Sequence, residues 1–430
     1  METEDGGIQT TRNLPQDILM AIFAAFQIPD LVRAGSVCSS WRSAYETMRN
    51  LGLYNQSQTP CLLYTSESDG ESTARLYSLV EKKAYRLTLP DPPIRTRSLV
   101  GSSPEGLLVT ADDRSEMHLL NPITGQQTAL PSVITIRQVS PIYDDSGVLR
   151  MYRYSAHTRH TVLALPANLA LSELRHQLHH KAFVFSLSDD DASYSSAAPA
   201  GRGGGGHIVV LIHNPSCQLS FARAGAESWT WLPPHTSYDD CMYKDGLMHA
   251  VTSKGEIHGF DLTSPAPVPT MKIIMEGPMT YRYLRMYIVQ APWGDLLQVW
   301  RKFGDRDLGD TPQSSLFWIT GKIRVYKVDA AANELERTSC LRGHALFLGH
   351  NQSLCLSTKE YPALKANHAY FTDDCKYWTM GLQNNHRDMG ILNLNDNCSE
   401  QLVCPHLWSN RPAPIWITPN LREINFNLDN

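Results

Sequence analysis

Four pairs of adjacent aspartates are the residues best placed to do chemistry. They are Asp112-Asp113, Asp144-Asp145, Asp239-Asp240 and Asp373-Asp374. Two neighbouring carboxyl groups can act as a general acid and a general base. Each pair, however, is flanked by residues typical of turns and strand ends, where aspartate is favoured because its side chain bonds the nearby backbone. We therefore interpret the pairs as turn residues rather than as a catalytic site.

Five histidines lie close together in sequence and raise the question of a metal site. They are His157, His160, His176, His179 and His180. A zinc site needs a defined set of about four ligands, usually with cysteine or carboxylate among them, and these spacings match no such set. The sequence also lacks a Gly-x-Ser-x-Gly or His-Glu-x-x-His motif. We predict no metal, no cofactor and no enzymatic activity.

A glycine string within residues 188–206 resembles a phosphate-binding loop only superficially. The segment reads SDDDASYSSAAPAGRGGGG, and no Gly-Lys-Ser/Thr follows it. Acidic and small residues of this kind favour a flexible surface loop. We predict such a loop between two strands.

The composition limits the classes of partner. The 430 residues include 42% hydrophobic and 19% charged residues, with a net charge of −5, which is typical of a globular protein and unlike a nucleic-acid binder. No apolar run approaches the roughly 20 residues that span a bilayer. Nine cysteines without a Cys-x-x-Cys pair favour reduced thiols. We expect no membrane or nucleic-acid partner and a location in the cytoplasm or nucleus.

The first 50 residues have helical periodicity. Pro15 suits the start of a helix, and Ile18, Leu19, Ile22, Phe23 and Phe26 follow on one broad apolar face. Pro29 ends this helix and opens a short second one over residues 30–34, and a third begins near Val37, with Cys38 on its apolar face. Three helices this short bury little among themselves, so a partner surface is expected to help.

The remainder of the chain has short β-like runs separated by turn residues, which indicates a sandwich, a barrel or a propeller. The strands that we predict span residues 61–65, 75–79, 106–110, 117–120, 133–137, 161–165, 183–187, 207–212, 216–222, 246–252, 256–262, 287–290, 296–303, 322–328, 345–348, 368–371, 378–381 and 390–393. A strand–turn–strand idiom recurs roughly every 40 to 65 residues, and the shorter spacings match a propeller blade.

Three consecutive segments of the helical region resemble the F-box. They are LPQDILMAIF at 14–23, PDLVR at 29–33 and VCSSWR at 37–42. The F-box is a three-helix module that docks onto the Skp-type adaptor of a cullin–RING ubiquitin ligase. The residues that this resemblance and the apolar pattern assign to the adaptor contact are Leu14, Pro15, Ile18, Leu19, Ile22, Phe23, Leu31, Val32, Val37 and Trp41.

The β-rich part is similar to the plant family called domain of unknown function 295, which commonly follows an F-box. The resemblance lies in IRVYKVD at 323–329, GHALFLG at 343–349 and AYFTDD at 369–374, and LNPITG at 120–125 resembles a turn shared by F-box propellers. It implies a propeller-like fold used for protein recognition, and residues 140–200 lie outside it.

Together these features predict an α+β multidomain protein: a small all-α F-box at residues 10–50, then a large all-β, propeller-like domain at 51–430. The implied function is that of a substrate receptor of an SCF-type ubiquitin ligase, which binds the Skp-type adaptor, and through it cullin and RING subunits, and holds an unknown protein substrate. Two alternatives stay open: a propeller that acts as an interaction or inhibitory protein outside a ligase, and a propeller hydrolase with a helical cap.

Overall fold

The N-terminal segment folds into the three helices that its periodicity predicts. In the computed structural model they are α1 (Gln16–Phe23), α2 (Ile28–Ala34) and α3 (Ser39–Asn50). Pro29 lies in the first turn of α2, where its missing N–H costs no hydrogen bond. The structure describes residues 14–54, 56–186, 207–223, 225–234, 236–263, 268–277, 284–306, 317–374, 387–402, 409 and 411–421.

Most of the remaining described chain forms six sheets of four or five strands, which we call blades 1 to 6. Blade 1 contains β1 (Cys61–Tyr64), β2 (Thr73–Ser78), β3 (Lys83–Thr88) and β28 (Ile415–Ile417). Blade 2 contains β4 (Ser98–Ser102), β5 (Leu108–Ala111), β6 (Met117–Leu120) and β7 (Gln127–Ala129). Blade 3 contains β11 (His179–Ser186), β12 (His207–His213), β13 (Gln218–Arg223) and β14 (Thr230–Trp231).

The second half of the ring is built in the same way. Blade 4 contains β15 (Tyr238–Lys244), β16 (Leu247–Thr252), β17 (Ile257–Phe260) and β18 (Met271–Met275). Blade 5 contains β19 (Leu284–Gln290), β20 (Leu296–Arg306), β21 (Phe317–Asp329) and β22 (Glu334–Thr338). Blade 6 contains β23 (His344–Leu348), β24 (Leu354–Ser357), β25 (His368–Phe371), β26 (Gly390–Asn393) and β27 (Ser399–Gln401).

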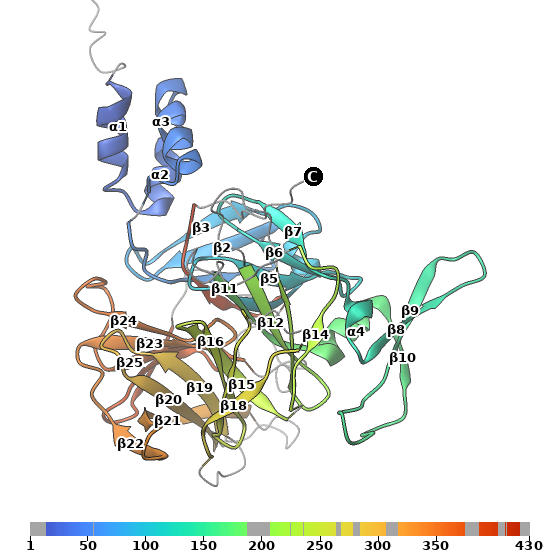
Figure 1. Ribbon diagram of the computed structural model, residues 1–430. Coiled ribbons are helices and arrows are strands. Elements are labelled where there is room, and N and C mark those ends of the chain that lie inside the picture. Colours follow the sequence, from blue (N-terminus) through green and yellow to red (C-terminus); the bar gives the residue numbers. More distant parts are fainter. Residues whose placement is uncertain are drawn as a thin grey trace, which may run out of the picture.

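Hydrophobic clusters join the blades into a closed ring. One cluster lies between each consecutive pair of blades, from 1 and 2 through to 5 and 6. A further cluster packs Leu62 and Tyr64 of blade 1 against Ala345, Phe347 and Tyr370 of blade 6. Because each blade buries both of its faces against neighbours, the ring has the architecture of a six-bladed propeller (Figure 1).

The two ends of the β-domain meet in blade 1. Strand β28 pairs antiparallel with β1, so Leu62 lies opposite Trp416. The Ser102 hydroxyl of blade 2 also donates a hydrogen bond of 2.6 Å to the Trp416 carbonyl oxygen. The last described strand therefore completes the first blade and closes the ring.

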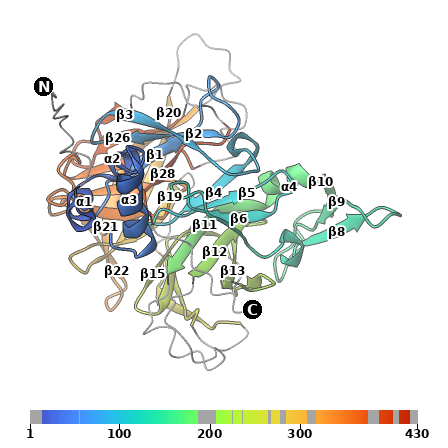
Figure 2. The same ribbon diagram turned by 90° about the horizontal axis from the view of Figure 1, so that it is seen from above.

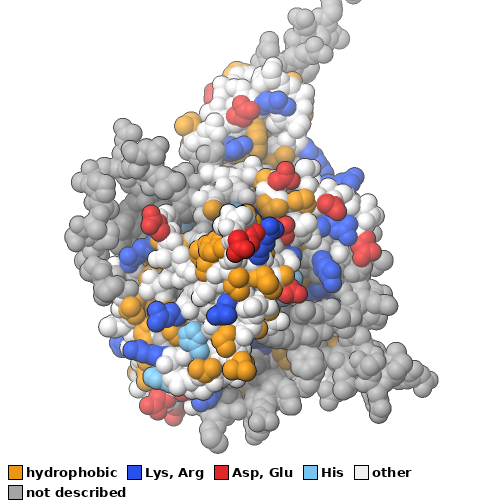
Figure 3. Space-filling model, turned by 90° about the vertical axis from the view of Figure 1, so that its right-hand side faces the viewer, with side chains coloured by type: hydrophobic (Ala, Val, Ile, Leu, Met, Phe, Trp, Pro, Cys, Tyr) orange, Lys and Arg blue, Asp and Glu red, His pale blue; other side chains and the backbone are white. Residues whose placement is uncertain are grey.

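An arm separates blades 2 and 3. It consists of the three-stranded sheet β8 (Val139–Tyr143), β9 (Leu149–Tyr154) and β10 (Ala167–Ala170), followed by α4 (Leu171–Leu178). The helical module stands on one side of the ring and the arm projects from the other (Figure 2). On the side that carries the arm, hydrophobic side chains gather on the molecular surface (Figure 3).

The structure corrects several sequence-based predictions. Residues 133–135 form a 3₁₀ turn instead of a strand, and residues 161–165 lie in a loop with one isolated bridge at Val162. Helix α4 was not predicted, because its eight residues follow directly from a strand without a proline or a polar N-cap. The predicted strand at 378–381 and the predicted loop at 188–206 lie outside the described residues.

Candidate functional site

Helix α1 exposes a line of apolar side chains. Leu14 precedes the helix by two residues, and Ile18 and Ile22 follow one helical turn apart. Their side chains are 44%, 45% and 39% exposed. We call these three residues the apolar strip. Pro15, Val32 and Val37 are also exposed, so six of the ten predicted adaptor-binding residues face solvent.

Three of the predicted contact residues lie inside the module instead. Leu19, Phe23 and Leu31 are buried and pack with Ile28 and Met48 in one cluster. Trp41 is half-buried, with its ring edge-on to Phe23 at 5.3 Å between centroids. The broad apolar face of α1 therefore divides in two: one half forms the core of the module and the other half is open to solvent.

The close packing of α2 on α3 requires a glycine between them. A Cβ atom at Gly35 would lie 2.9 Å from the ring of Tyr45, so a larger residue would push the helices apart. Cys38 is an exposed N-cap residue of α3, which corrects the prediction that it lies on the buried face of that helix. It does not contribute to the core.

The linker after α3 is bound to the helical module by side-chain hydrogen bonds. The Tyr54 hydroxyl donates to the Phe26 carbonyl oxygen at 2.5 Å and accepts a hydrogen bond from Gln58 at 2.8 Å. The Gln58 side chain in turn accepts the Ile28 N–H at 3.1 Å. Burial raises the pKa of Tyr54 to about 12, so the hydroxyl keeps its proton as a donor.

Two longer-range contacts hold the module on blade 1. The Arg33 guanidinium lies over the Tyr85 ring of β3, 4.6 Å from its centroid. Leu421, beyond the last strand, is buried in the core of the helical module. The position of the apolar strip is thus set relative to the propeller by direct contacts.

The aspartate pairs divide into two kinds. Asp112 and Asp144 lie in turns as predicted, where their side chains accept backbone N–H groups. Asp239 and Asp240, by contrast, are buried on strand β15, and Asp373 and Asp374 are buried just after β25. The prediction that all four pairs are ordinary turn residues is wrong for these two.

Asp240 connects four blades through its two oxygens. Lys181 of blade 3 lies 2.7 Å from one oxygen. The other accepts the Ser353 hydroxyl of blade 6 at 2.7 Å and the Ile288 N–H of blade 5 at 3.0 Å. Burial raises the pKa of Asp239 and Asp240 above the usual aspartate value. Both oxygens of Asp240 are thus engaged by groups of other blades, which indicates a structural role at the centre of the ring.

A second charged cluster lies between blades 5 and 6. Arg301 is fully buried and donates to the Tyr287 hydroxyl at 3.1 Å and the Thr372 carbonyl oxygen at 2.8 Å. The Tyr287 hydroxyl donates to Asp374 at 2.6 Å. Burial opposes ionisation of Asp374, but Arg285 and Arg301 hold the pKa of this carboxyl well below its usual value. We call the Asp240 and Arg301 clusters together the hub.

The histidines form no metal site among the described residues, where no group of three or more potential ligands is found. His157 packs edge-on against Trp231 of blade 3, with 5.9 Å between ring centroids. None of the seven cysteines in the described ranges forms a disulfide. Within the same ranges no helix is long and apolar enough to cross a bilayer.

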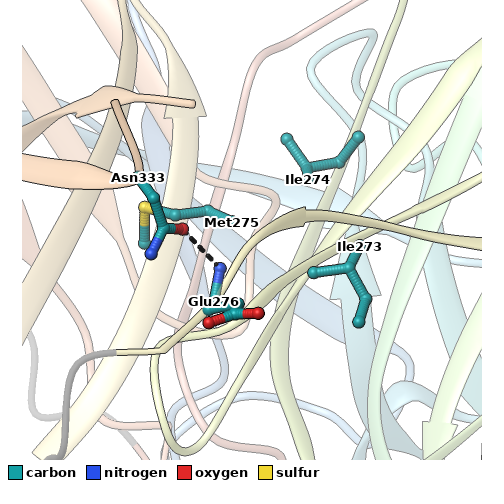
Figure 4. A pocket seen from close by; sticks show the side chains of 5 residues that line it. All are labelled: Ile273, Ile274, Met275, Glu276 and Asn333. Carbon is teal, nitrogen blue, oxygen red and sulfur yellow. Dashed lines mark hydrogen bonds between the residues drawn. The ribbon is translucent and has the colours of Figure 1, made fainter. Parts of the chain in front are cut away.

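A shallow hollow of about 440 Å³ lies at the edge of blades 4 and 5. Ile273, Ile274, Met275 and Glu276 of the β18 segment line it with Asn333, which follows β21 (Figure 4). The Asn333 side chain accepts the Glu276 N–H at 2.8 Å. One carboxylate and three apolar side chains in an open depression do not make a catalytic constellation.

Comparison with known proteins identifies the family to which the propeller belongs. A model of the KIB1-4 β-propeller matches residues 76–393, well over half of the chain. The chain belongs to the KIB1-4 β-propeller family. An F-box-like model matches residues 11–48, directly before this KIB1-4 propeller. The prediction of an F-box followed by a propeller is therefore confirmed.

Relatives of this KIB1-4 protein are F-box proteins of Arabidopsis thaliana. The F-box protein At5g55150 is 22% identical over 397 residues, which cover 91% of both chains. The F-box protein SKIP23 is 22% identical over 428 residues, covering 95% of this chain and 96% of the relative. The F-box/kelch-repeat protein At1g57790 is 31% identical over 136 residues, 30% of this chain and 35% of the relative.

F-box proteins are in general non-catalytic adaptors that bring substrates to SCF ligases, and the matches support this general role for the present chain. Sequence reasoning did not find the hub, the clamp formed by Tyr54 and Gln58, or the arm. The hub alone had a signal in the sequence, since aspartates at 239 and 240 interrupt an otherwise apolar strand.

Proposed function

We propose that this protein is the substrate-recognition subunit of an SCF-type ubiquitin ligase. In this proposal the helical module binds the Skp-type adaptor and, through it, cullin and RING subunits, while the propeller holds a protein target. The chain supplies no catalytic group of its own. It accelerates ubiquitin transfer by keeping the target close to the charged enzyme, which makes the reaction effectively intramolecular.

One observation carries the proposal: the module leaves an apolar strip in solvent although its own core is complete. Leu19, Phe23 and Leu31 fill the interior, and Leu14, Ile18 and Ile22 stay 39–45% exposed. Exposed apolar surface of this kind marks a protein-binding site. Complete burial of a fully exposed side chain of this kind contributes roughly 1.5–3 kcal/mol. Since the residues of the strip are already more than half buried, each contributes less than this, and we expect Val32 and Val37 to share the contact with them.

The adaptor contact is tested with an Ile18→Asp variant of the full chain and a purified Skp-type adaptor. We expect the wild type to capture the adaptor and Ile18→Asp to weaken binding at least a hundredfold, because a charge would enter an apolar interface. Val80→Asp, at a 46% exposed position of blade 1, is the matched control and should bind normally. A wild-type protein that captures no adaptor, or an Ile18→Asp variant that binds equally well, refutes the proposal.

The clamp between the module and blade 1 supports the same function. Proximity raises the rate only when the target is held at a fixed place relative to the ligase. Tyr54 and Gln58 bind the linker to the module, and Arg33 and Leu421 connect the module to blade 1 and to the segment after β28. The proposal also places the protein in the cytoplasm or nucleus.

A further inference from the structure

We propose that the loop between β9 and β10 of the arm, residues 155–166, docks an apolar and acidic segment of the target protein. We call this loop the finger. The inference builds on the proposed function, since it names the surface and the chemistry by which the target is held. It rests on the exposure, the internal order and the charge of the finger.

The finger exposes large apolar side chains that the fold does not use. Val162, Leu163 and Leu165 are 73%, 51% and 88% exposed, three of four consecutive residues. Single exposed leucines are common on protein surfaces, but contiguous ones favour aggregation unless a partner covers them. The face that carries the arm shows such a concentration of hydrophobic side chains (Figure 3).

Backbone hydrogen bonds order the finger before any partner arrives. The Thr158 N–H donates to the Thr161 carbonyl oxygen and the Leu163 N–H to the Ala156 carbonyl oxygen, each at 2.8 Å. His157 and Val162 form an antiparallel bridge between these two bonds. A loop held in one conformation loses little conformational entropy on binding, which favours its use as a recognition element.

The base of the finger is fixed to the ring. Gln138 and Gln218, the latter in blade 3, each donate a side-chain hydrogen bond of 3.3 Å to the His157 carbonyl oxygen. The His157 ring packs against Trp231 of the same blade. The buried side chains of Tyr152 and Leu174 anchor the rest of the arm between blades 2 and 3. A partner bound to the finger is therefore held at a defined distance from the helical module.

The charges around the finger indicate which kind of partner it binds. Between Asp145 and Glu173 the chain contains Arg150, Arg153 and Arg159 and no further aspartate or glutamate, although its net charge is −5. Arg150 is paired with Asp144 at 2.7 Å. Arg153 and Arg159 are exposed, and no ion pair to either is found within the described ranges. Apolar side chains beside uncompensated arginines fit a segment that carries both apolar residues and carboxylates.

Two synthetic peptides test this prediction with the full-length protein. Both contain the same leucines and isoleucines, but one carries glutamates where the other carries lysines. By fluorescence anisotropy we expect the wild type to bind the glutamate peptide at least tenfold more tightly than the lysine peptide. A Val162→Asp/Leu165→Asp double variant should bind the glutamate peptide at least tenfold more weakly than the wild type does. Arg159→Glu should reduce or reverse the preference for the glutamate peptide over the lysine peptide. Ile273→Asp, at a 55% exposed position in blade 4, is the matched control and should bind as the wild type does.

Several outcomes would overturn the inference. Equal binding of the two peptides, no binding of the glutamate peptide, or unchanged binding by the double variant each reject it. If sedimentation shows that the wild type is a dimer and the double variant a monomer, the finger binds a second copy of this chain instead. If the wild type binds phosphatidylserine vesicles and the double variant does not, the finger binds a lipid surface instead.

Capture of the Skp-type adaptor separates this inference from the proposed function. The finger variants should capture the adaptor as the wild type does, because helix α1, which carries the apolar strip, and the arm lie on different sides of the ring (Figure 2). Normal capture with no peptide selectivity rejects the finger alone. If the wild type does not capture the adaptor, the ligase role is rejected. The peptide result then still tests whether the finger binds an apolar and acidic segment.

Discussion

The helical module and the hub place their side chains in opposite ways. In the module, Leu14, Ile18 and Ile22 are exposed, although leucine and isoleucine are among the residues most often buried. In the hub, Lys181, Asp240 and Arg301 are almost entirely buried, although charged residues rarely are. Each region departs from the usual pattern, and the departures have different causes.

This difference distinguishes side chains that stabilise the fold from side chains that bind a partner. The hub charges contact one another across blades, so their burial is explained within the chain. The apolar side chains of α1 have no such internal explanation, because the module core is complete without them. A buried charge with its partners present indicates structure, and an exposed apolar strip on an ordered helix indicates a missing partner.

The sharpest test of this comparison is a pair of adjacent substitutions in α1. Leu19→Asp should unfold the module, because an unpaired charge would enter its core at a cost of more than about 4 kcal/mol. Ile18→Asp should leave the fold unchanged, since that side chain is 45% exposed. Circular dichroism and limited proteolysis of the N-terminal region measure both. If the two variants behave alike, the division of α1 into a core half and a binding half is wrong.

The next largest effect is expected in the hub. Lys181→Met leaves the Asp240 carboxylate buried without its cation, which should lower the free energy of unfolding by about 3–5 kcal/mol. Denaturation in urea gives this difference. The matched control is Lys244→Met, because the Lys244 side chain is 38% exposed and lies 3.7 Å from Asp245. This change should alter stability by less than about 0.5 kcal/mol. If Lys181→Met and Lys244→Met lowered the free energy of unfolding equally, the Lys181–Asp240 pair would not be a structural element of the hub.

The pH dependence of the hub is a further test. The pKa of Asp374 is lowered in the folded protein, so its contribution to stability is present above the ordinary aspartate value of 3.8 and is lost as the pH falls through the folded value. Asp374→Asn lacks this contribution. The difference in unfolding free energy between wild type and variant should therefore shrink as the pH falls below about 4. A difference that stays constant from pH 7 to pH 3 contradicts the assigned ionisation.

The smallest expected effect concerns ring closure. Ser102→Ala removes the hydrogen bond to the Trp416 carbonyl oxygen and should cost about 1 kcal/mol, because this bond is buried. Thermal unfolding detects the change, and Ser43→Ala on the exposed face of α3 is the control. A Ser102→Ala protein that melts with the wild type would show that pairing of β28 with β1 closes the ring without this bond.

The helical module could be predicted because its signals are local. Pro15, Pro29 and the spacing of apolar residues determine three helices within 35 residues. The periodicity could not separate Ile18 from Leu19, since both lie on the same broad face of α1. Which of the two is buried depends on where α2 and α3 cross that face, and no pattern within α1 contains this information.

The propeller could be predicted only in part, because its blades depend on contacts between distant residues. Most strands were found from their apolar runs, but residues 161–165 have the same composition and form an exposed loop. Asp239 and Asp240 were assigned to a turn from their flanking residues, since nothing local shows that Asp239 contacts Arg285 or that Asp240 contacts Lys181 and Ser353, which lie far away in sequence. Only the folded ring shows that these aspartates are core residues.

The position of β28 has a consequence for synthesis of the chain. As the protein leaves the ribosome, blade 1 lacks its last strand until residues 415–417 emerge, and the module lacks Leu421 until still later. A nascent or prematurely terminated chain can therefore form neither a sealed ring nor a finished helical core. Both the ring and the module can therefore be completed only after translation has passed residue 421, so truncated copies are expected to be cleared as misfolded.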